Sequence, residues 1–144
     1  MKRFLKYILC IILLSYSLYG SKIAVATKVT GIVEIMPTGE KDFLKLKPGR
    51  VLSDGDKIRT GSSGFAAIIF IDDKSILKLK EDSEAVIAGK RTAASISKKI
   101  NMDSGTVRAT VKKQNIDFVI QTPTSVASVK GTDFWLLSDP ISGD

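Results

Sequence analysis

Residues 65–79 read FAAIIFIDDKSILKL, two apolar segments on either side of a short polar turn. The first segment, residues 65–71, is a continuous apolar run, which is typical of a strand buried on both faces. The turn at residues 72–75 carries two aspartates and a serine, which favour chain reversal. Leu77 and Leu79 then lie at the two-residue spacing that places both side chains on one face of a strand. This stretch therefore predicts two strands joined by a tight turn.

Similar segments follow one another along most of the chain, separated by glycine or by Asp/Ser clusters. Further strands are expected at residues 29–35, 43–46, 51–52, 85–88, 96–102, 105–107, 117–120 and 132–137. Strand signals that recur about every 8–12 residues are typical of an all-β sandwich, barrel or roll. No segment shows the apolar spacing of an amphipathic helix. We therefore expect one all-β domain of short strands at residues 28–137, arranged as a β-roll, a solenoid-like stack or a sandwich. Residues 138–144 would form a turn or tail.

The first 20 residues differ from the rest of the chain. Three basic residues precede an uncharged, mostly apolar run at residues 7–18, which is typical of a secretory signal peptide. The run is short for a membrane-spanning helix, which needs about 20 apolar residues. We expect a signal helix that is cleaved after Gly20 or after Ala26, and an exported protein of the periplasm or cell envelope. Contact with the membrane would come only from an uncleaved signal.

The composition restricts the classes of function. The chain has 144 residues, of which 22 are basic and 15 acidic, and it has no histidine. Its one cysteine, Cys10, lies in the signal, so no disulfide is expected after export. Cleavage after Gly20 would remove three basic residues and leave 19 basic against 15 acidic residues, a net charge of +4. The basic segment at residues 90–99 has no interleaved aromatic residues, which single-stranded nucleic-acid sites use for stacking. We interpret it as a solvated loop and expect no nucleic-acid partner.

Two Ser-x-x-Lys pairs, Ser75 with Lys78 and Ser95 with Lys98, match the spacing of serine enzymes that use a lysine partner. That spacing places both side chains on one face in a helix. On a strand, residues three apart point to opposite faces. Histidine is absent and no cysteine follows the signal, so the commonest nucleophiles and bases are missing as well. We therefore expect no enzymatic activity and no cofactor.

Two acidic pairs, Asp54 with Asp56 and Asp72 with Asp73, raise the question of a calcium site. A calcium loop supplies several oxygen ligands at regular offsets and closes with a bidentate acid. Neither pair has a downstream acid at the required offset. Aspartate and glycine also tolerate the backbone angles of turns. We interpret both pairs as turns and expect no metal.

Several motifs together resemble one known family. Residues 52–61, LSDGDKIRTG, resemble a motif of the form L-x-x-G-D-x-I-x-T-G, and residues 67–79 resemble the strand, Asp-Gly-Ser turn and strand that follow it. Residues 105–107 resemble a G-x-V step. Residues 118–134, FVIQTPTSVASVKGTDF, are similar to the most specific signature, which contains T-P and R-G-T. The family is the FecR domain, and the resemblance covers residues 28–137.

The resemblance also implies which residues shape the fold. The structural motif residues carried over from the family are Gly55, Asp56, Thr60, Thr122, Pro123, Lys130, Gly131, Thr132 and Phe134. Two positions depart from the family pattern. Lys130 stands where arginine is usual, which replaces a planar donor fork with a point charge. Lys74 stands where the turn usually has glycine, so a positive φ angle there would be strained.

The C-terminal signature gives further structural expectations. Thr122 and Pro123 are expected to start a strand at a sheet edge, where the missing N–H of proline costs little. Gly131 would allow close backbone approach, and three apolar side chains would fill the core: those of Val126, Val129 and Phe134. Trp135 follows Phe134 on the same strand and points to the opposite face, so Trp135 is a candidate ligand contact. The family pattern usually continues past this strand into another hairpin, which is missing here. We therefore expect an unpaired edge, a fold that closes without the return strand, or a shortened version of the domain.

The family resemblance implies a periplasmic sensing domain without catalysis. FecR itself is a membrane regulator that senses a TonB-dependent receptor and signals to a sigma factor. Only six residues precede Tyr7, so a complete relay across the membrane is not expected. The expected partner is an envelope protein, such as a TonB-dependent receptor or a membrane regulator, docked by strand addition at the open edge. Three alternatives stay open: a polysaccharide or peptidoglycan module that uses Trp135 and the basic loop at residues 90–99, an accessory of a signalling system, and self-association through the open edge.

Overall fold

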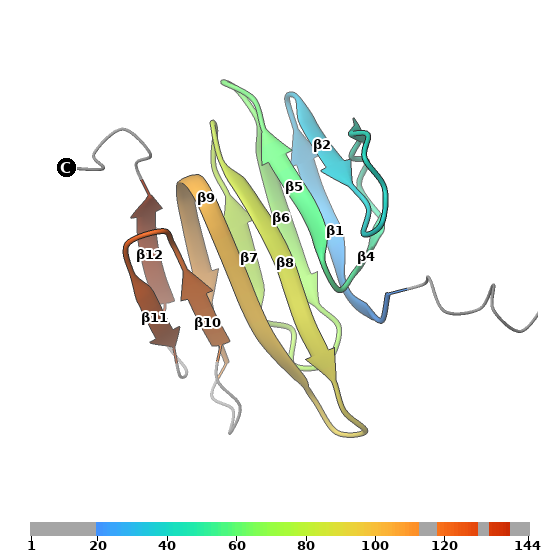
Figure 1. Cartoon of the computed structure of the whole chain (residues 1–144), viewed down its shortest axis with the longest axis vertical. Coiled ribbons are helices and arrows are strands. Elements are labelled where there is room, and N and C mark those ends of the chain that lie inside the picture. Colours follow the sequence, from blue (N-terminus) through green and yellow to red (C-terminus); the bar gives the residue numbers. More distant parts are fainter. Residues whose placement is uncertain (1–19, 113–117, 130–132, 139–144) are drawn as a thin grey trace, which may run out of the picture.

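A computed structural model describes residues 20–112, 118–129 and 133–138 (Figure 1). The described chain contains strands and turns and no helix, which confirms the all-β prediction. The expected signal helix lies outside the described residues. Of the two expected cleavage positions, Gly20 precedes the first strand, whereas Ala26 lies inside it and is fully buried.

Twelve strands make up this part of the chain. They are β1 (Lys22–Thr30), β2 (Val33–Met36), β3 (Leu44–Lys45), β4 (Val51–Ser53), β5 (Asp56–Thr60), β6 (Phe65–Phe70), β7 (Ile76–Leu79), β8 (Glu84–Arg91), β9 (Ile96–Thr110), β10 (Phe118–Gln121), β11 (Val126–Val129) and β12 (Asp133–Ser138). All strand pairs are antiparallel except that of β10 with β9, which is parallel.

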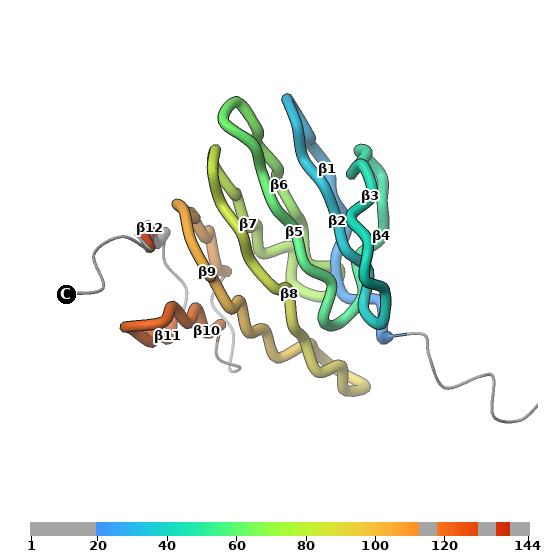
Figure 2. Tube along the Cα trace, turned by 45° about the horizontal axis from the view of Figure 1, so that its top comes forward, coloured from blue at the N-terminus to red at the C-terminus, as the bar shows by residue number. Residues whose placement is uncertain are grey.

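The strands form one curled, open sheet, with the order β3-β2-β5-β8-β9-β7-β6-β1-β4 along its main path. β10 and β12 both pair with β9, and β11 pairs with β10. Figure 2 shows the curl, with β2, β5 and β8 facing β1, β6 and β7. The expected roll or sandwich is thus an open half-barrel whose two layers are continuous through β9.

β9 bends where it passes from one layer to the other. Its first part pairs with β8 and β10, and its second part with β7 and β12. Gly105 lies at the bend with a φ of +97°, and a Cβ there would lie 2.2 Å from Ser83 Oγ. A side chain at this position would therefore be strained and would clash. The two segments expected at residues 96–102 and 105–107 are one strand because this glycine lets it bend without a break.

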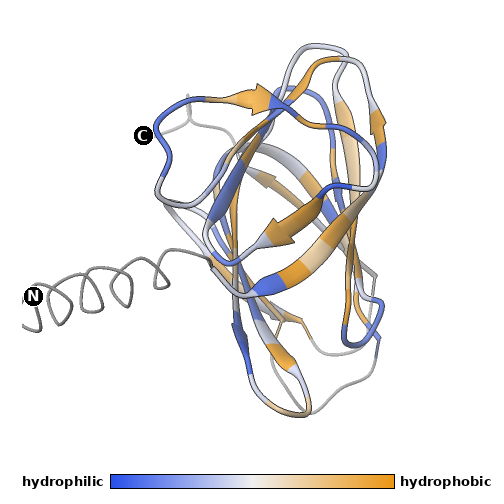
Figure 3. Cartoon of the chain, turned by 90° about the vertical axis from the view of Figure 1, so that its right-hand side faces the viewer, coloured by the Kyte–Doolittle hydropathy of each residue, from blue (hydrophilic) through white to orange (hydrophobic). Residues whose placement is uncertain are grey.

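The core fills the space inside the curl. Buried residues alternate with partly buried ones along most strands, and Figure 3 shows the same alternation of hydropathy. The rings of Phe70 in β6 and Phe118 in β10 meet edge to face, with centroids 5.5 Å apart. The strand at residues 65–71 was expected to be buried on both faces, and this is wrong for its outer face. Phe65 and Ile69 are only partly buried there, because one side of the curl faces solvent.

The sheet ends differently on its two sides, which we call the closed side and the open side. The closed side consists of β3, β4 and the connecting residues 46–50. Leu46 is buried there, and its N–H donates to Val33 O, while Gly49 N–H donates to Ala26 O. One connection therefore covers the edges of both layers. The open side consists of β11 and β12, and it lies opposite the closed side in Figure 1.

Candidate functional site

The first family motif, residues 52–61, is a structural junction. Gly55 has a φ of +88° and allows the tight turn from β4 into β5. The buried carboxylate of Asp56 accepts hydrogen bonds from Thr38 N at 2.9 Å and from Ser53 N at 2.8 Å. Thr38 Oγ1 also donates to Asp54 O at 2.6 Å. Asp56 therefore fixes the loop after β2 against the β4–β5 turn. The interpretation of the acidic pair as a turn holds for Asp54, whereas Asp56 is the first residue of β5.

Thr60 performs a similar role at the other end of β5. Its Oγ1 donates to Lys80 O at 2.5 Å and accepts from Ser83 N at 2.9 Å. Thr60 N–H also donates to Ser83 O at 2.8 Å. These bonds join the end of β5 to the β7–β8 turn. The hydroxyl and the carboxylate of this motif are thus engaged with backbone groups of the fold.

The second family signature lies partly in the β10–β11 hairpin. Thr122 and Pro123 follow β10 and form the turn, in which Ser125 N donates to Thr122 Oγ1 at 3.0 Å. The expectation that they start a strand is therefore wrong. Proline suits the turn, because a residue there does not have to donate a backbone N–H to a neighbouring strand. Val129 is buried as expected. Val126 is 68% exposed, which corrects its assignment to the core, because it begins the outermost strand of this layer.

The remaining signature positions are less fully described. Lys130, Gly131 and Thr132 lie outside the described residues. Phe134 belongs to β12, opposite Ala109 of β9, but its side chain is also outside the described part. The roles expected for these residues therefore stay predictions. Lys74, the other departure from the family, does have a positive φ, of 61°.

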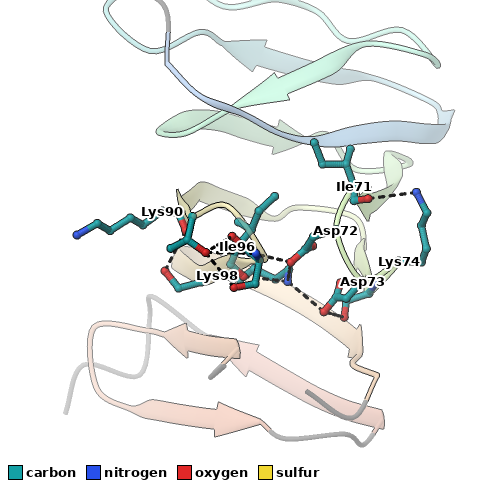
Figure 4. Close-up of polar contacts among 11 residues, drawn as sticks. Ile71, Asp72, Asp73, Lys74, Lys90, Ile96 and Lys98 are labelled. Atoms are coloured by element: carbon teal, nitrogen blue, oxygen red, sulfur yellow. Dashed lines mark hydrogen bonds and ion pairs between the residues drawn. The ribbon is translucent and has the colours of Figure 1, made fainter. Parts of the chain in front are cut away.

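A buried ion-pair network joins the two layers near the open side (Figure 4). Lys98 of β9 has a side chain that is 0% exposed, and its Nζ lies 2.9 Å from Asp72 Oδ2 and 3.0 Å from Asp73 Oδ2. Both aspartates belong to the β6–β7 turn. Asp72 Oδ2 also accepts from Ile96 N at 2.8 Å. The interpretation of residues 90–99 as a solvated loop is thus wrong for Lys98.

The network also sets the ionisation of Asp72. Burial by itself raises the pKa of this carboxyl group, because it disfavours the charged form. The hydrogen bond from Lys98 and those from the backbone N–H groups of Ile96 and Asp73 outweigh burial, so the pKa of Asp72 is lowered. The charged carboxylate is therefore the form that fits the fold.

The two Ser-x-x-Lys pairs are placed differently from a catalytic pair. Ser75 is buried and donates to Asp73 Oδ2 at 2.8 Å, while Lys78 lies on the outer face of β7. Ser95 lies within 3.2 Å of Thr92 Oγ1 in the β8–β9 turn, and Lys98 points inward to the aspartates. In residues 20–112, 118–129 and 133–138, no cluster of three potential metal-ligating side chains occurs.

The candidate functional surface lies on β12. Trp135 is 51% exposed and Leu137 is 73% exposed, on the outer face of the sheet. Trp135 pairs with Arg108 of β9, which pairs in turn with Lys78 of β7. The Arg108 guanidinium and the Lys80 ammonium each lie 4.9 Å from the centre of the Trp135 ring. We call these five side chains, Trp135, Leu137, Arg108, Lys78 and Lys80, the β12 surface.

The edge of β12 adds backbone groups to this surface. β12 has six residues, and its pairing within the described chain is with β9. Alternate N–H and C=O groups of an edge strand point away from the sheet and can pair with another strand. The sequence indicated Trp135 and an open edge, but it did not identify Lys80 and Arg108, which lie 55 and 27 residues before Trp135. The strand register brings them together.

Comparison with known protein families identifies the family of this chain. A sequence model described as FecR protein matches residues 56–142. The chain belongs to the FecR family. The match begins at Asp56 of the first motif and includes both the β6–β7 turn and the β12 surface of this FecR domain. No curated protein and no solved structure matches the chain.

Membership in the FecR family indicates a domain related to signalling and regulation, of a kind that is typically associated with the cell envelope. None of the described residues belong to a helix that is long and apolar enough to cross a membrane. Neither finding assigns a role to the β12 surface of this FecR domain.

Proposed function

We propose that this FecR domain is an exported, non-enzymatic binding module that docks another envelope protein by adding a strand to β12. The observation that carries the proposal is the exposure of Trp135 and Leu137 on a six-residue edge strand. Large apolar side chains gathered on a surface mark interaction sites more often than single exposed ones do. A partner strand would gain backbone hydrogen bonds from the edge and apolar contacts from the two side chains.

The other edges of the sheet are less suited to strand addition. β3 has two residues and β4 has three, and short edge strands offer few backbone groups to a partner. β11 has four residues, among which Val126 is the one large apolar side chain that is strongly exposed. β12 combines the greatest edge length with the largest exposed side chains, which supports it as the docking strand.

A glycan-binding module has less support from the geometry. That alternative combined Trp135 with the basic loop at residues 90–99. Trp135 lies beside Arg108 near the end of β9, whereas residues 90–99 lie around the start of β9 at Ile96, so the two do not form one site. In addition, two cations lie over the Trp135 ring, where a sugar would have to stack.

Site-specific crosslinking in cells tests the proposal. A photo-crosslinking amino acid would replace Leu137 in one strain and Ile32 in another. Ile32 is a matched control, because it is 71% exposed, close to the 73% of Leu137, and lies in the β1–β2 turn away from β12. We expect a defined envelope protein to be captured at position 137 and not at position 32.

A competing variant sharpens this test. Leu137→Lys places a charge on the edge strand, which is a common natural defence against strand pairing. We expect the variant to fold, since position 137 is exposed, and to lose capture from a crosslinker placed at position 135, which is 51% exposed on the same face. Equal capture at positions 137 and 32, or capture that Leu137→Lys leaves unchanged, would contradict docking at β12.

A further inference from the structure

The charged side chains of the described segments around the open side are mostly basic. The described segments there are residues 76–80, 105–112, 118–129 and 133–138, which contain β7, the second part of β9, and β10 to β12. They carry four basic residues, Lys78, Lys80, Arg108 and Lys112, and a single acidic residue, Asp133. Within these described segments, basic residues therefore outnumber acidic ones four to one.

Among the described residues, the acidic side chains of the adjoining β6–β7 and β7–β8 turns lie away from β12. Asp72 and Asp73 are engaged with Lys98 inside the fold. Glu81 and Asp82 are exposed in the β7–β8 turn, beyond the end of β7, and Asp82 N–H donates to Gly61 O in that turn. Lys78 and Arg108 lie instead in one row with Trp135 of β12, and Lys80 Nζ lies over the Trp135 ring.

The basic side chains are also within reach of an added strand. Neighbouring strands lie about 4.8 Å apart, so a strand added to β12 would lie about 10 Å from the backbone of β9. The Arg108 guanidinium and the Lys80 ammonium already extend over Trp135, at 4.9 Å from its ring centre. A glutamate on the outer face of the added strand, opposite Trp135, would meet these cations above the ring.

We infer that the segment docked on β12 is an acidic extended segment of a partner protein, with carboxylates at alternate positions on its outer face. The inference rests on the proposed docking at β12 and specifies the partner's chemistry. A second copy of this chain fits less well, because its own β12 surface would bring the same basic side chains into the pair. Opposite charges across an interface favour association, and like charges oppose it.

Trp135 provides a direct readout of this site, because it is the one tryptophan in the chain. The probes are short synthetic peptides in which valine alternates with glutamate, with glutamine or with lysine. Binding is followed by the change in Trp135 fluorescence as each peptide is added to the exported domain. We expect the glutamate peptide to bind more tightly than the glutamine peptide, the lysine peptide to bind weakest, and added salt to reduce these differences.

Single-residue variants test whether the preference for the glutamate peptide comes from the β12 surface. Lys80→Gln should weaken binding of the glutamate peptide about two- to fivefold, as expected for an exposed ion pair, and leave the glutamine peptide unaffected. Lys45→Gln is the matched control, because Lys45 is an exposed lysine on β3 of the closed side. Lys78→Gln provides a second test if Lys80→Gln disturbs the fold.

The outcomes separate the inference from the proposed function. If the three peptides bind equally, and Leu137→Lys abolishes all binding, docking at β12 stands and the acidic partner is excluded. If no peptide binds but a polyuronate oligosaccharide changes the fluorescence, the occupant is an anionic glycan, and both ideas fail. If the fluorescence changes with protein concentration alone and the mass doubles, the occupant is a second copy, and the acidic segment is excluded.

Discussion

On the closed side the sheet ends in β3 and β4, two and three residues long, whereas on the open side it ends partly in β12, six residues long. The residues between β3 and β4 hydrogen-bond to both layers and insert Leu46 into the core. Near the open side the two layers are joined instead by side chains, through the Phe70–Phe118 contact and the ion pairs of Lys98. One sheet thus has one short, covered side and one long side with exposed apolar residues.

Exposure of an edge strand, as at β12, is therefore not a general property of this fold. The chain covers its edges where β3 and β4 lie, whereas among the described residues β12 has β9 as its one partner strand. Two features distinguish the closed side from the open side. Side-chain contacts hold the layers together near the open side, and the connection on the closed side is a buried part of the core.

Replacement of Lys98 by methionine should have the largest effect on stability. Loss of the ammonium leaves Asp72 and Asp73 without their buried counterion, and breaking a buried ion pair in this way costs about 3–5 kcal/mol. The free energy of unfolding is measured by chemical denaturation. Lys99→Met is the matched control, since Lys99 is the next residue of β9 and is exposed. Equal losses in the two variants would show that the ion pairs do not join the layers.

Truncation of Leu46 on the closed side should have the next largest effect. Leu46→Ala removes a side chain that is 1% exposed, and buried leucine-to-alanine changes cost about 2–5 kcal/mol. The comparison is with Leu44→Ala, two residues earlier, where the side chain is 51% exposed and a loss of about 0.5 kcal/mol or less is expected. If both leucines contribute equally to the thermal midpoint, the closed side is not anchored by Leu46.

Acidification should weaken the network near the open side. The folded protein lowers the pKa of Asp72, so its contribution is present above the unfolded pKa of about 3.9 and is lost as the pH falls through the folded pKa. We expect Asp72→Asn to be less stable than the parent chain at neutral pH, and this difference to shrink as the pH is lowered. Thermal unfolding between neutral and acidic pH measures it, with the exposed Asp42→Asn as control. A constant difference across the pH range would be inconsistent with this role.

Relief of backbone strain in the β6–β7 turn should give the smallest effect, and one of opposite sign. Lys74 has a φ of 61°, and Lys74→Gly places there a residue that adopts this region freely, with an expected gain of about 0.5–1 kcal/mol. Asp82→Gly is the comparison, because Asp82 has a φ of 52° and aspartate tolerates this region better than lysine. A loss of stability in Lys74→Gly would mean that the lysine side chain stabilises the turn more than its backbone strains it.

Local sequence patterns predicted much of the fold. Alternating apolar residues and turn residues located most strands, and the first family motif identified Asp56 and Thr60 as structural positions. The motif was informative because the side chains of Asp56 and Thr60 bond to backbone groups of neighbouring turns. The bend of β9 was not predicted, because a glycine such as Gly105 is compatible with a turn, a bulge or a strand end.

The candidate site was predicted only in part. Trp135 is conspicuous in the sequence, but Lys80 and Arg108 become its neighbours only through the register of β7, β9 and β12. Lys98 was assigned to a solvated loop because it lies in a basic run. Its partners are in the β6–β7 turn, 25 and 26 residues earlier, and no local pattern connects the two segments.

The sharing of β9 between both layers has a consequence for hydrogen exchange. Since its first part pairs with β8 and β10 and its second part with β7 and β12, loss of either layer removes backbone partners from the other. The amides of β9 that bond to β8 and β7 should therefore exchange with solvent only when the whole domain unfolds. β11 and β12 each have one partner strand within the described chain, so they can fray while the rest stays folded. The strand that we propose as the docking edge is thus one that can open at low energetic cost.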